Sequence, residues 1–197
     1  PEEKRVEVYY ALGGGTKGFS YWWYTPYGNF HGCGSSDPSG VSLYNEIARL
    51  GAEVRTAAPL ILRSCPAGLD VEKPKNLSVW PLLVGRDSLV LLNINEQICS
   101  DRLGTVVVQQ EDVKSLVRIP SWLKPADVFE ISSSGISDAT WTIENSDLSV
   151  DLGTVFLTRM IVVTSDASLR ATLQGLYKER FEGNIKSLPE VTLPEQP

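Results

Sequence analysis

Several features that would place this chain in a specialised class are scarce or missing. Its 197 residues include only three cysteines, one histidine and one methionine, and there is no long apolar run. Three cysteines without paired CxxC units exclude a disulfide scaffold and a zinc framework. The absence of a long apolar run excludes a membrane span. Acidic residues outnumber basic ones by 24 to 18, and the net charge of −6 disfavours nucleic acid and anionic lipid as partners.

What is present is the composition of a globular protein, with 42% hydrophobic and 21% charged residues. At roughly 100 to 200 residues per domain, the length allows one large domain or two small ones, and a complete eight-fold βα-barrel needs roughly 250. The start at Pro1 has no methionine, basic region or apolar region, so we expect a processed chain or a piece of a longer one. The compartment stays open, with a secreted or periplasmic location slightly favoured.

The first third of the chain alternates helix and strand patterns. Two glutamates after Pro1 suit the first turn of a helix, which Gly13-Gly14-Gly15 ends. Phe19–Tyr24 is dominated by aromatic residues and stops at a Thr-Pro pair, which predicts a buried strand. A long loop rich in turn formers follows, and then Ser42 is the expected cap of a second helix that ends near Pro59.

The rest of the chain is mostly β in pattern. Short alternating segments separated by turn residues predict an antiparallel sandwich. Ser165 or Asp166 can then cap a C-terminal helix. The expected strands are Ser78–Val84, Ser88–Asn93, Thr105–Gln110, Lys114–Ile119, Asp127–Ser132, Thr140–Ile143, Leu148–Leu152 and Val155–Thr164.

These patterns divide the chain into four stretches. Residues 1–63 form a helix-strand-helix unit that cannot bury both faces of its own strand and so needs a larger partner. Residues 64–77, rich in proline and charge, are the expected linker. Residues 78–185 are the sandwich with its terminal helix, and residues 186–197 are a polar tail.

The first unit resembles the end of the barrel in β-galactosidase-like glycoside hydrolases. The resemblance rests on Tyr10–Tyr24 (YALGGGTKGFSYWWY) followed by Leu43–Val54 (LYNEIARLGAEV). In such enzymes a helix and a Lys-Gly pair lead into the eighth barrel strand, whose end is aromatic, and the eighth helix precedes a C-terminal β-domain. The resemblance implies a mixed fold class, α/β plus all-β: the terminal βα element of a TIM-type barrel followed by an antiparallel β-sandwich and a C-terminal helix.

The same resemblance implies a sugar-binding role for the aromatic segment. A tryptophan at the end of the eighth strand commonly forms the floor of the sugar subsite, and Trp22 and Trp23 match it. Since strand side chains alternate, only one of the two can face the site, and a core role for either ring stays open. Tyr24 and His31 complete the candidate substrate-binding set. For His31, ordinary loop chemistry is the simpler alternative.

No catalytic pair of carboxyl groups is recognisable in this sequence. Glu46 and Glu53 fall on a helix expected to pack outside the barrel, and Asp37 is more simply a turn residue. In the resembled enzymes the acid/base follows the fourth strand and the nucleophile the seventh, so both would precede Pro1. Arg159, in the last strand, is expected to be an ion-paired sheet residue.

The leading hypothesis is therefore the C-terminal part of a glycoside hydrolase acting on oligo- or polysaccharide. Its partners are a carbohydrate substrate and the barrel upstream of Pro1, with no cofactor, metal, nucleic acid or membrane. The alternatives are a carbohydrate-binding sandwich and a structural or oligomerisation module, so a homo-oligomer stays open. For Trp80, Trp122 and Trp141, packing is the expected role and sugar binding the alternative.

Overall fold

The computed structural model describes residues 1–21, 33–101 and 104–189. The helices are α1 (Glu2–Gly13), α2 (Pro38–Thr56), α3 (Ala58–Ile61), α4 (Leu169–Arg180) and α5 (Glu182–Lys186). The strands are β1 (Ser64–Pro66), β2 (Val71–Glu72), β3 (Leu77–Val84), β4 (Ser88–Asn95), β5 (Ile98–Asp101), β6 (Gly104–Val107), β7 (Gln110–Arg118), β8 (Asp127–Ser132), β9 (Gly135–Asp138), β10 (Thr140–Glu144), β11 (Asp147–Val155) and β12 (Thr158–Thr164).

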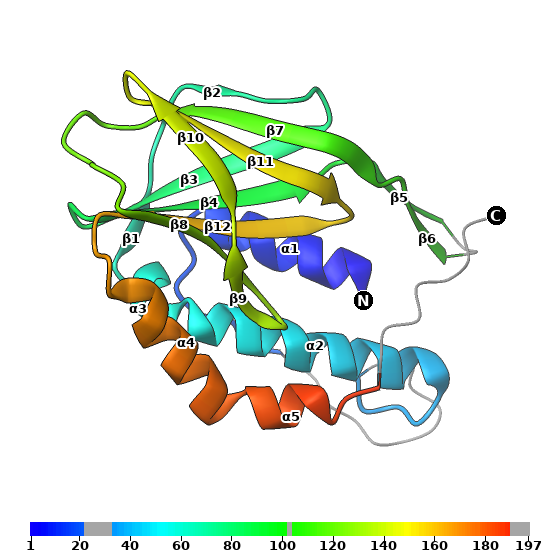
Figure 1. Cartoon of the computed structure of the whole chain (residues 1–197). Helices are drawn as coiled ribbons and strands as arrows, with labels where there is room; N and C mark the ends of the chain where they lie inside the picture. The colour runs from blue at the N-terminus through cyan, green and yellow to red at the C-terminus, as the bar shows by residue number, and fades with distance from the viewer. Residues whose placement is uncertain (22–32, 102–103, 190–197) are drawn as a thin grey trace.

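The described residues form two stacked sheets with helices on one side (Figure 1). A six-stranded sheet has the order β1-β3-β4-β12-β8-β9, and a four-stranded sheet has the order β10-β11-β7-β2. All recorded pairings are antiparallel. Strands β5 and β6 form a separate hairpin. The expected antiparallel sandwich is therefore present.

The six-stranded sheet is buried on both faces. Along β4, Val90 and Leu92 pack toward the helices, whereas Leu89 and Leu91 pack toward the other sheet. The alternation of a strand places these residues on opposite faces, and all eight residues of β4 are buried. The apolar run in the sequence is thus explained by a central position in a three-layer structure.

Helix α1 packs over β3, β4 and β12, and α2 contacts β8, α4 and α5. Val8 and Leu12 of α1 and Leu50 of α2 belong to the same core cluster as Leu82 of β3. Residues 1–63 and the sandwich therefore share a core. One side of the helices is covered by the six-stranded sheet.

Helices α1 and α2 run in the same direction. Arg5, near the start of α1, bonds to Glu46, and Tyr9, one turn later, bonds to Glu53, which also lies further along α2. Beyond the helices, the Lys17 amine donates to the carbonyl oxygens of Ile61 and Ser64, so the C-terminal ends also meet. The start of α2 therefore lies beside the start of α1, and the ends of the two helices lie at the same side of the molecule (Figure 1).

Most expected elements are present, and the differences have local causes. Helix α2 starts at Pro38 because Asp37, not Ser42, is the cap: the Asp37 carboxylate accepts the backbone N–H groups of Ser39 and Gly40. Strands β1 and β2 lie within the expected linker of residues 64–77, and β5 and β9 were not expected. These strands have two to four residues, too few to produce a clear alternation.

Candidate functional site

The four predicted substrate-binding residues, Trp22, Trp23, Tyr24 and His31, lie outside the described residues. The start of their segment is described. Phe19 and Tyr21 are 38% and 44% exposed, and neither is in a strand. The expected buried strand is therefore not seen over residues 19–21, because no described strand lies beside them to pair with their backbone.

Tyr21 lies near charged residues of both helices. Burial raises the pKa of its hydroxyl, and the charges of Lys4, Glu7 and Glu46 also act on it. Lys4 and Glu7 belong to the first two turns of α1, whereas Lys17 is bound beside the C-terminal ends of the helices. The connection therefore travels back along α1 between Lys17 and Tyr21.

The tryptophans of the sandwich have different environments. Trp80 packs edge to face with Tyr10, with ring centroids 6.1 Å apart, and lies directly against Gly13, where an added Cβ would be 2.7 Å from the indole. Trp141 is half-buried against the core between the sheets. Trp122 is 49% exposed. Trp80 and Trp141 thus have the packing role expected of them.

The outer face of the four-stranded sheet does not favour sugar binding by the sandwich. Trp141 is on its inner side, and among the described residues no aromatic side chain alternates outward. The outward residues, opposite to the buried Leu148, Val150 and Val117 rows, are Glu72, Lys114, Leu116, Arg118, Thr140, Thr142, Asp147, Ser149 and Asp151. Such a charged surface lacks the apolar platform on which a sugar ring stacks.

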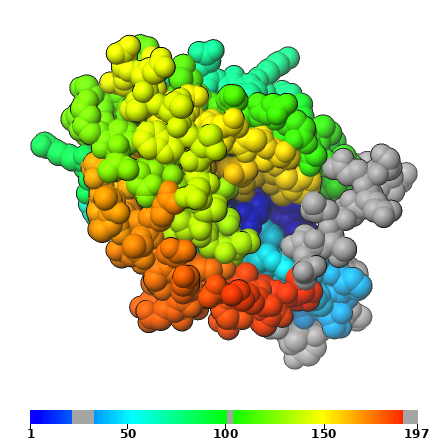
Figure 2. Space-filling model, in the orientation of Figure 1, coloured from blue at the N-terminus to red at the C-terminus, as the bar shows by residue number. Residues whose placement is uncertain are grey.

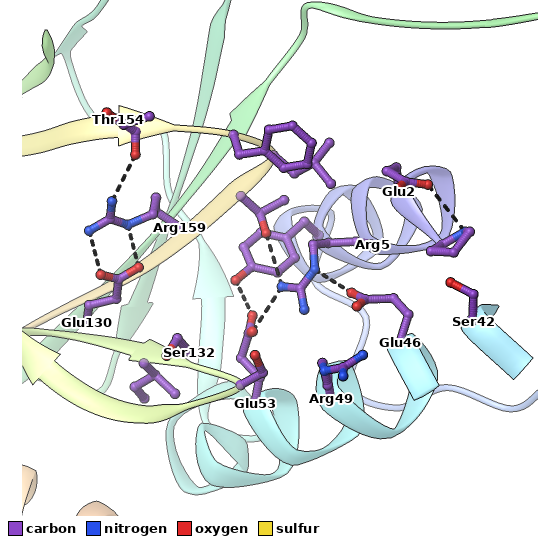
Figure 3. Close-up of a pocket in the computed structure, with 17 residues that line it drawn as sticks. Glu2, Arg5, Ser42, Glu46, Arg49, Glu53, Glu130, Ser132, Thr154 and Arg159 are labelled. Carbon is purple, nitrogen blue, oxygen red and sulfur yellow. Dashed lines mark hydrogen bonds and ion pairs between the residues drawn. The ribbon is translucent and has the colours of Figure 1, made fainter. Parts of the chain in front are cut away.

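A cavity of about 430 Å³ lies where α1 and α2 meet the ends of β8, β11 and β12 (Figure 3). Figure 2 shows part of it as a recess in which α1 is visible between the strands and α2. It is lined by Pro1, Glu2, Arg5, Tyr9, Ser42, Glu46, Arg49, Glu53, Glu130, Ile131, Ser132, Ser133, Thr154, Phe156, Leu157, Thr158 and Arg159.

One wall of this cavity is a buried network centred on Arg5. Its guanidinium donates to Glu46 at 2.6 Å, to Glu53 at 3.0 Å and to the Thr158 hydroxyl at 3.3 Å. The Tyr9 hydroxyl donates to the second oxygen of Glu53, which is only 2% exposed. Burial acts to lower the pKa of Arg5, but the charges of Glu53 and Glu46 outweigh it and raise that pKa. The network joins α1, α2 and β12.

The opposite wall is the ion pair of Glu130 and Arg159, as expected for Arg159. Arg159 donates to both carboxylate oxygens of Glu130 and to the backbone oxygens of Leu152 and Thr154. Burial raises the pKa of Glu130, whereas its hydrogen bonds with Arg159 and the charge of Arg159 act to lower it. The pair ties β8 and β12 to β11 at the border of the two sheets.

The carboxylates of this cavity are held by arginines: Glu46, Glu53 and Glu130 each accept from a guanidinium group. Such fixed donors and acceptors can bind a polar ligand. Within the described ranges there is also no group of three or more potential metal ligands. No described helix is long and apolar enough to cross a membrane.

The sequence did not point to this cavity. Ser42, Glu46, Arg49 and Glu53 follow one another at helical spacing on one side of α2, which is a recognisable polar stripe. A polar stripe on a helix is usually solvated, and its meeting with Arg5 depends on how α1 and α2 dock. The only signal in the sequence was the unusual polarity of that stripe.

No protein-family model matches this chain, and no curated protein matches it. Solved structures with a partial likeness include α-L-fucosidase isoenzyme 2 from Paenibacillus thiaminolyticus, with 10% identity over 50% of this chain and 15% of that chain and a TM-score of 0.40. Another is a cycloisomaltooligosaccharide glucanotransferase from Paenibacillus sp., solved with cycloisomaltoheptaose. The match has 9% identity, covers 58% of this chain and 20% of that chain, and has a TM-score of 0.46. This chain thus spans a fifth or less of those proteins, and at these TM-scores neither match assigns it a family or an activity.

Proposed function

We propose that this chain is the C-terminal part of a glycoside hydrolase that acts on oligo- or polysaccharide. In this proposal, residues 1–63 close a βα-barrel and carry aromatic sugar-binding residues, and the sandwich is an accessory domain packed against the barrel helices. The catalytic carboxylates belong to the part of the enzyme upstream of Pro1.

The observation that carries the proposal is the parallel arrangement of α1 and α2. Consecutive helices of a βα-barrel run parallel to each other, and the strand between them runs in the opposite direction. Two helices joined by a short hairpin would be antiparallel instead. The bonds from Arg5 to Glu46 and from Tyr9 to Glu53 therefore support a helix-strand-helix unit of the barrel type.

The path of the connection supports a strand between the helices. Four residue steps from Lys17 to Tyr21 cover about 13 Å when extended. The nine residues from Gly13 back to Lys4 cover about 14 Å along the helix. Lys17 is bound near the C-terminal ends of the helices and the charge of Lys4, near the start of α1, acts on Tyr21, so the segment leads back toward the start of α1. A barrel strand at this position would continue through Trp22 and Trp23.

The apolar side chains left exposed on the first unit also fit the proposal. Large apolar side chains remain exposed along the first unit, namely those of Phe19, Tyr21, Val41, Tyr44 and Leu62. The six-stranded sheet already covers the other side of α1. The remaining strands and helices of a barrel would cover apolar groups of this kind, which are costly to leave in water.

The direct test is on the natural polypeptide. We expect its intact mass to exceed the 21.7 kDa of this chain, with a strand ending in glutamate encoded roughly ten to thirty residues before Pro1. We also expect the full polypeptide to hydrolyse an aryl glycoside or an oligosaccharide. Trp22→Ala or Trp23→Ala should then lower kcat/KM by about tenfold or more, because a stacked ring stabilises the bound sugar by more than about 1 kcal/mol.

Trp122→Ala is the matched control, because this exposed tryptophan belongs to a loop of the sandwich. Its kinetics should equal those of the parent enzyme. Unchanged kinetics in both Trp22→Ala and Trp23→Ala, or a natural polypeptide with no upstream barrel, would refute the proposal. The carbohydrate-binding sandwich is not favoured as an alternative, because the outer face of the four-stranded sheet is charged and carries no aromatic ring among the described residues.

A further inference from the structure

The cavity between the helices and the sandwich is close to electrically neutral. Three arginines and four glutamates line it. The inner guanidinium groups, those of Arg5 and Arg159, are each bound to carboxylates. At these inner positions an anionic ligand would meet arginines that are already neutralised, and a cationic ligand would meet glutamates that are already neutralised; the exposed Arg49 donates to the backbone oxygen of Pro189. An uncharged ligand fits this environment best.

The cavity offers hydrogen-bond donors and acceptors side by side. Arginine only donates and a carboxylate only accepts, and in this cavity the two types alternate across both walls. A hydroxyl group can donate to the carboxylate and accept from the neighbouring guanidinium. Neighbouring hydroxyl groups on one ring match such Arg–Glu pairs. The serines Ser42, Ser132 and Ser133 add further polar positions.

The lining also has an apolar part, formed by Ile131, Phe156 and Leu157. An aromatic ring next to fixed polar groups can contact the C–H face of a sugar ring while the polar groups bind its hydroxyls. The volume of about 430 Å³ lies within the range of roughly 300 to 1,000 Å³ typical of small-molecule sites.

We propose that this cavity binds an uncharged saccharide of one or two rings, at a site separate from the aromatic segment that starts at Phe19. Among the described residues, none of the connection between α1 and α2 lines it. The choice of a saccharide among uncharged polyhydroxylated ligands rests on the proposed function. The site would hold a sugar chain at the junction of the helices and the sandwich without taking part in hydrolysis.

Ser42 offers a way to fill the cavity without disturbing the core. It is exposed in the first turns of α2 and lies beside Glu46 at the cavity wall (Figure 3). Ser42→Trp should therefore occupy the space that a sugar ring would take. Val41→Trp is the matched control, because Val41 is 44% exposed, precedes Ser42 directly and does not line the cavity.

The experiment is a chemical-shift titration of the isotope-labelled 197-residue chain with glucose, galactose, lactose, maltose and cellobiose. We expect at least one sugar to bind, with shifts at Ser132, Thr154 and Arg159. Ser42→Trp should weaken that binding about tenfold or more, and Val41→Trp should leave it within about twofold. Phe156→Ala, which removes the ring, should also weaken it, with the dispersion of the spectrum reporting that the variant is folded.

Two results would overturn the inference. One is the absence of binding by all five sugars. The other is binding that Ser42→Trp leaves intact and that Trp22→Ala or Trp23→Ala removes, which would place the sugar at the aromatic segment. In either case the proposed hydrolase function is judged separately, by the mass and the glycosidase activity of the natural polypeptide.

Discussion

The two faces of the six-stranded sheet are packed in different ways. The apolar cluster between the sheets consists of leucine, valine and isoleucine, with the buried Ser115 beside it. Its ion pair, Glu130 with Arg159, lies at the border. The face under the helices instead carries the Arg5, Glu46 and Glu53 network next to its apolar core, and Glu53 is almost completely buried.

The difference reflects how each pair of layers is held in position. Two pleated sheets pack through rows of branched side chains that alternate along every strand. Two helices on a sheet lack this regular strand-by-strand alternation, so polar contacts can help to fix their position. The directional bonds of Arg5 to both helix α2 and strand β12 specify one position. We expect the helix face to depend on charge and the sheet face on packing.

The largest effect should come from breaking the network on the helix face. Glu53→Ala leaves the Arg5 guanidinium with one carboxylate instead of two and should destabilise the fold by about 3 kcal/mol. Urea unfolding followed by circular dichroism measures this loss. Leu91→Ala, in the core between the sheets, should lower the free energy of unfolding by a comparable amount, about 2 to 5 kcal/mol, because it leaves a cavity.

On the helix face, the stability lost by removing one charge should be regained when its partner charge is also replaced. The double variant Arg5→Met with Glu53→Leu replaces the buried pair by apolar side chains and should regain most of the stability lost in Glu53→Ala. Glu46, which lines the cavity, can then be hydrated. A double variant as unstable as the single one would show that the loss in Glu53→Ala does not come from leaving the Arg5 charge with too few partners.

A smaller effect of opposite sign is expected in the core between the sheets. The hydroxyl of Ser115, which is 1% exposed, has no hydrogen-bond partner among the described residues. Ser115→Ala removes this unpaired group and should stabilise the fold by about 1 kcal/mol, measured by the same urea titration. Ser149→Ala on the outer face of the neighbouring strand is the control and should change little. If Ser115→Ala instead lowers the free energy of unfolding, the Ser115 hydroxyl has a hydrogen-bond partner in solution.

The smallest effect should be a change in pH dependence at the border of the sheets. Burial raises the folded-state pKa of Glu130 above its ordinary value of 4.5, so the contribution of this group to stability is present below that value and is lost as the pH rises through the folded-state pKa. Glu130→Gln cannot titrate, so its stability should fall less than that of the parent over this range. Urea midpoints from about pH 4 to pH 8 measure the difference. Parallel profiles for the two proteins would contradict the raised pKa.

Elements with a strong internal pattern were predicted well. Strand β8 has the predicted bounds of Asp127 and Ser132, and the first helix ends at Gly13 as its glycine turn indicated. In both cases the residues that define the element also determine its ends. The predicted start of α2 was wrong, because both Asp37 and Ser42 can cap a helix. Pro38, at the first helical position, favours Asp37 as the cap.

The functional predictions depended more on residues far apart in the chain. The aromatic segment was recognised from its composition, and its role as a barrel strand stays a prediction. The cavity was not foreseen, because Arg5 meets Thr158 across 153 residues and Glu53 across 48. Neither periodicity nor spacing carries information about contacts at such separations.

The sequence by itself determined the sandwich class and the positions of most of its strands along the chain, because these follow from short apolar and alternating segments separated by turn residues. Only the tertiary structure decided that α1 and α2 lie parallel on one face of the sheet and which carboxylates the arginines bind. These features depend on how separate elements pack against one another. The interactions that favour one packing arrangement join residues that are far apart in the sequence.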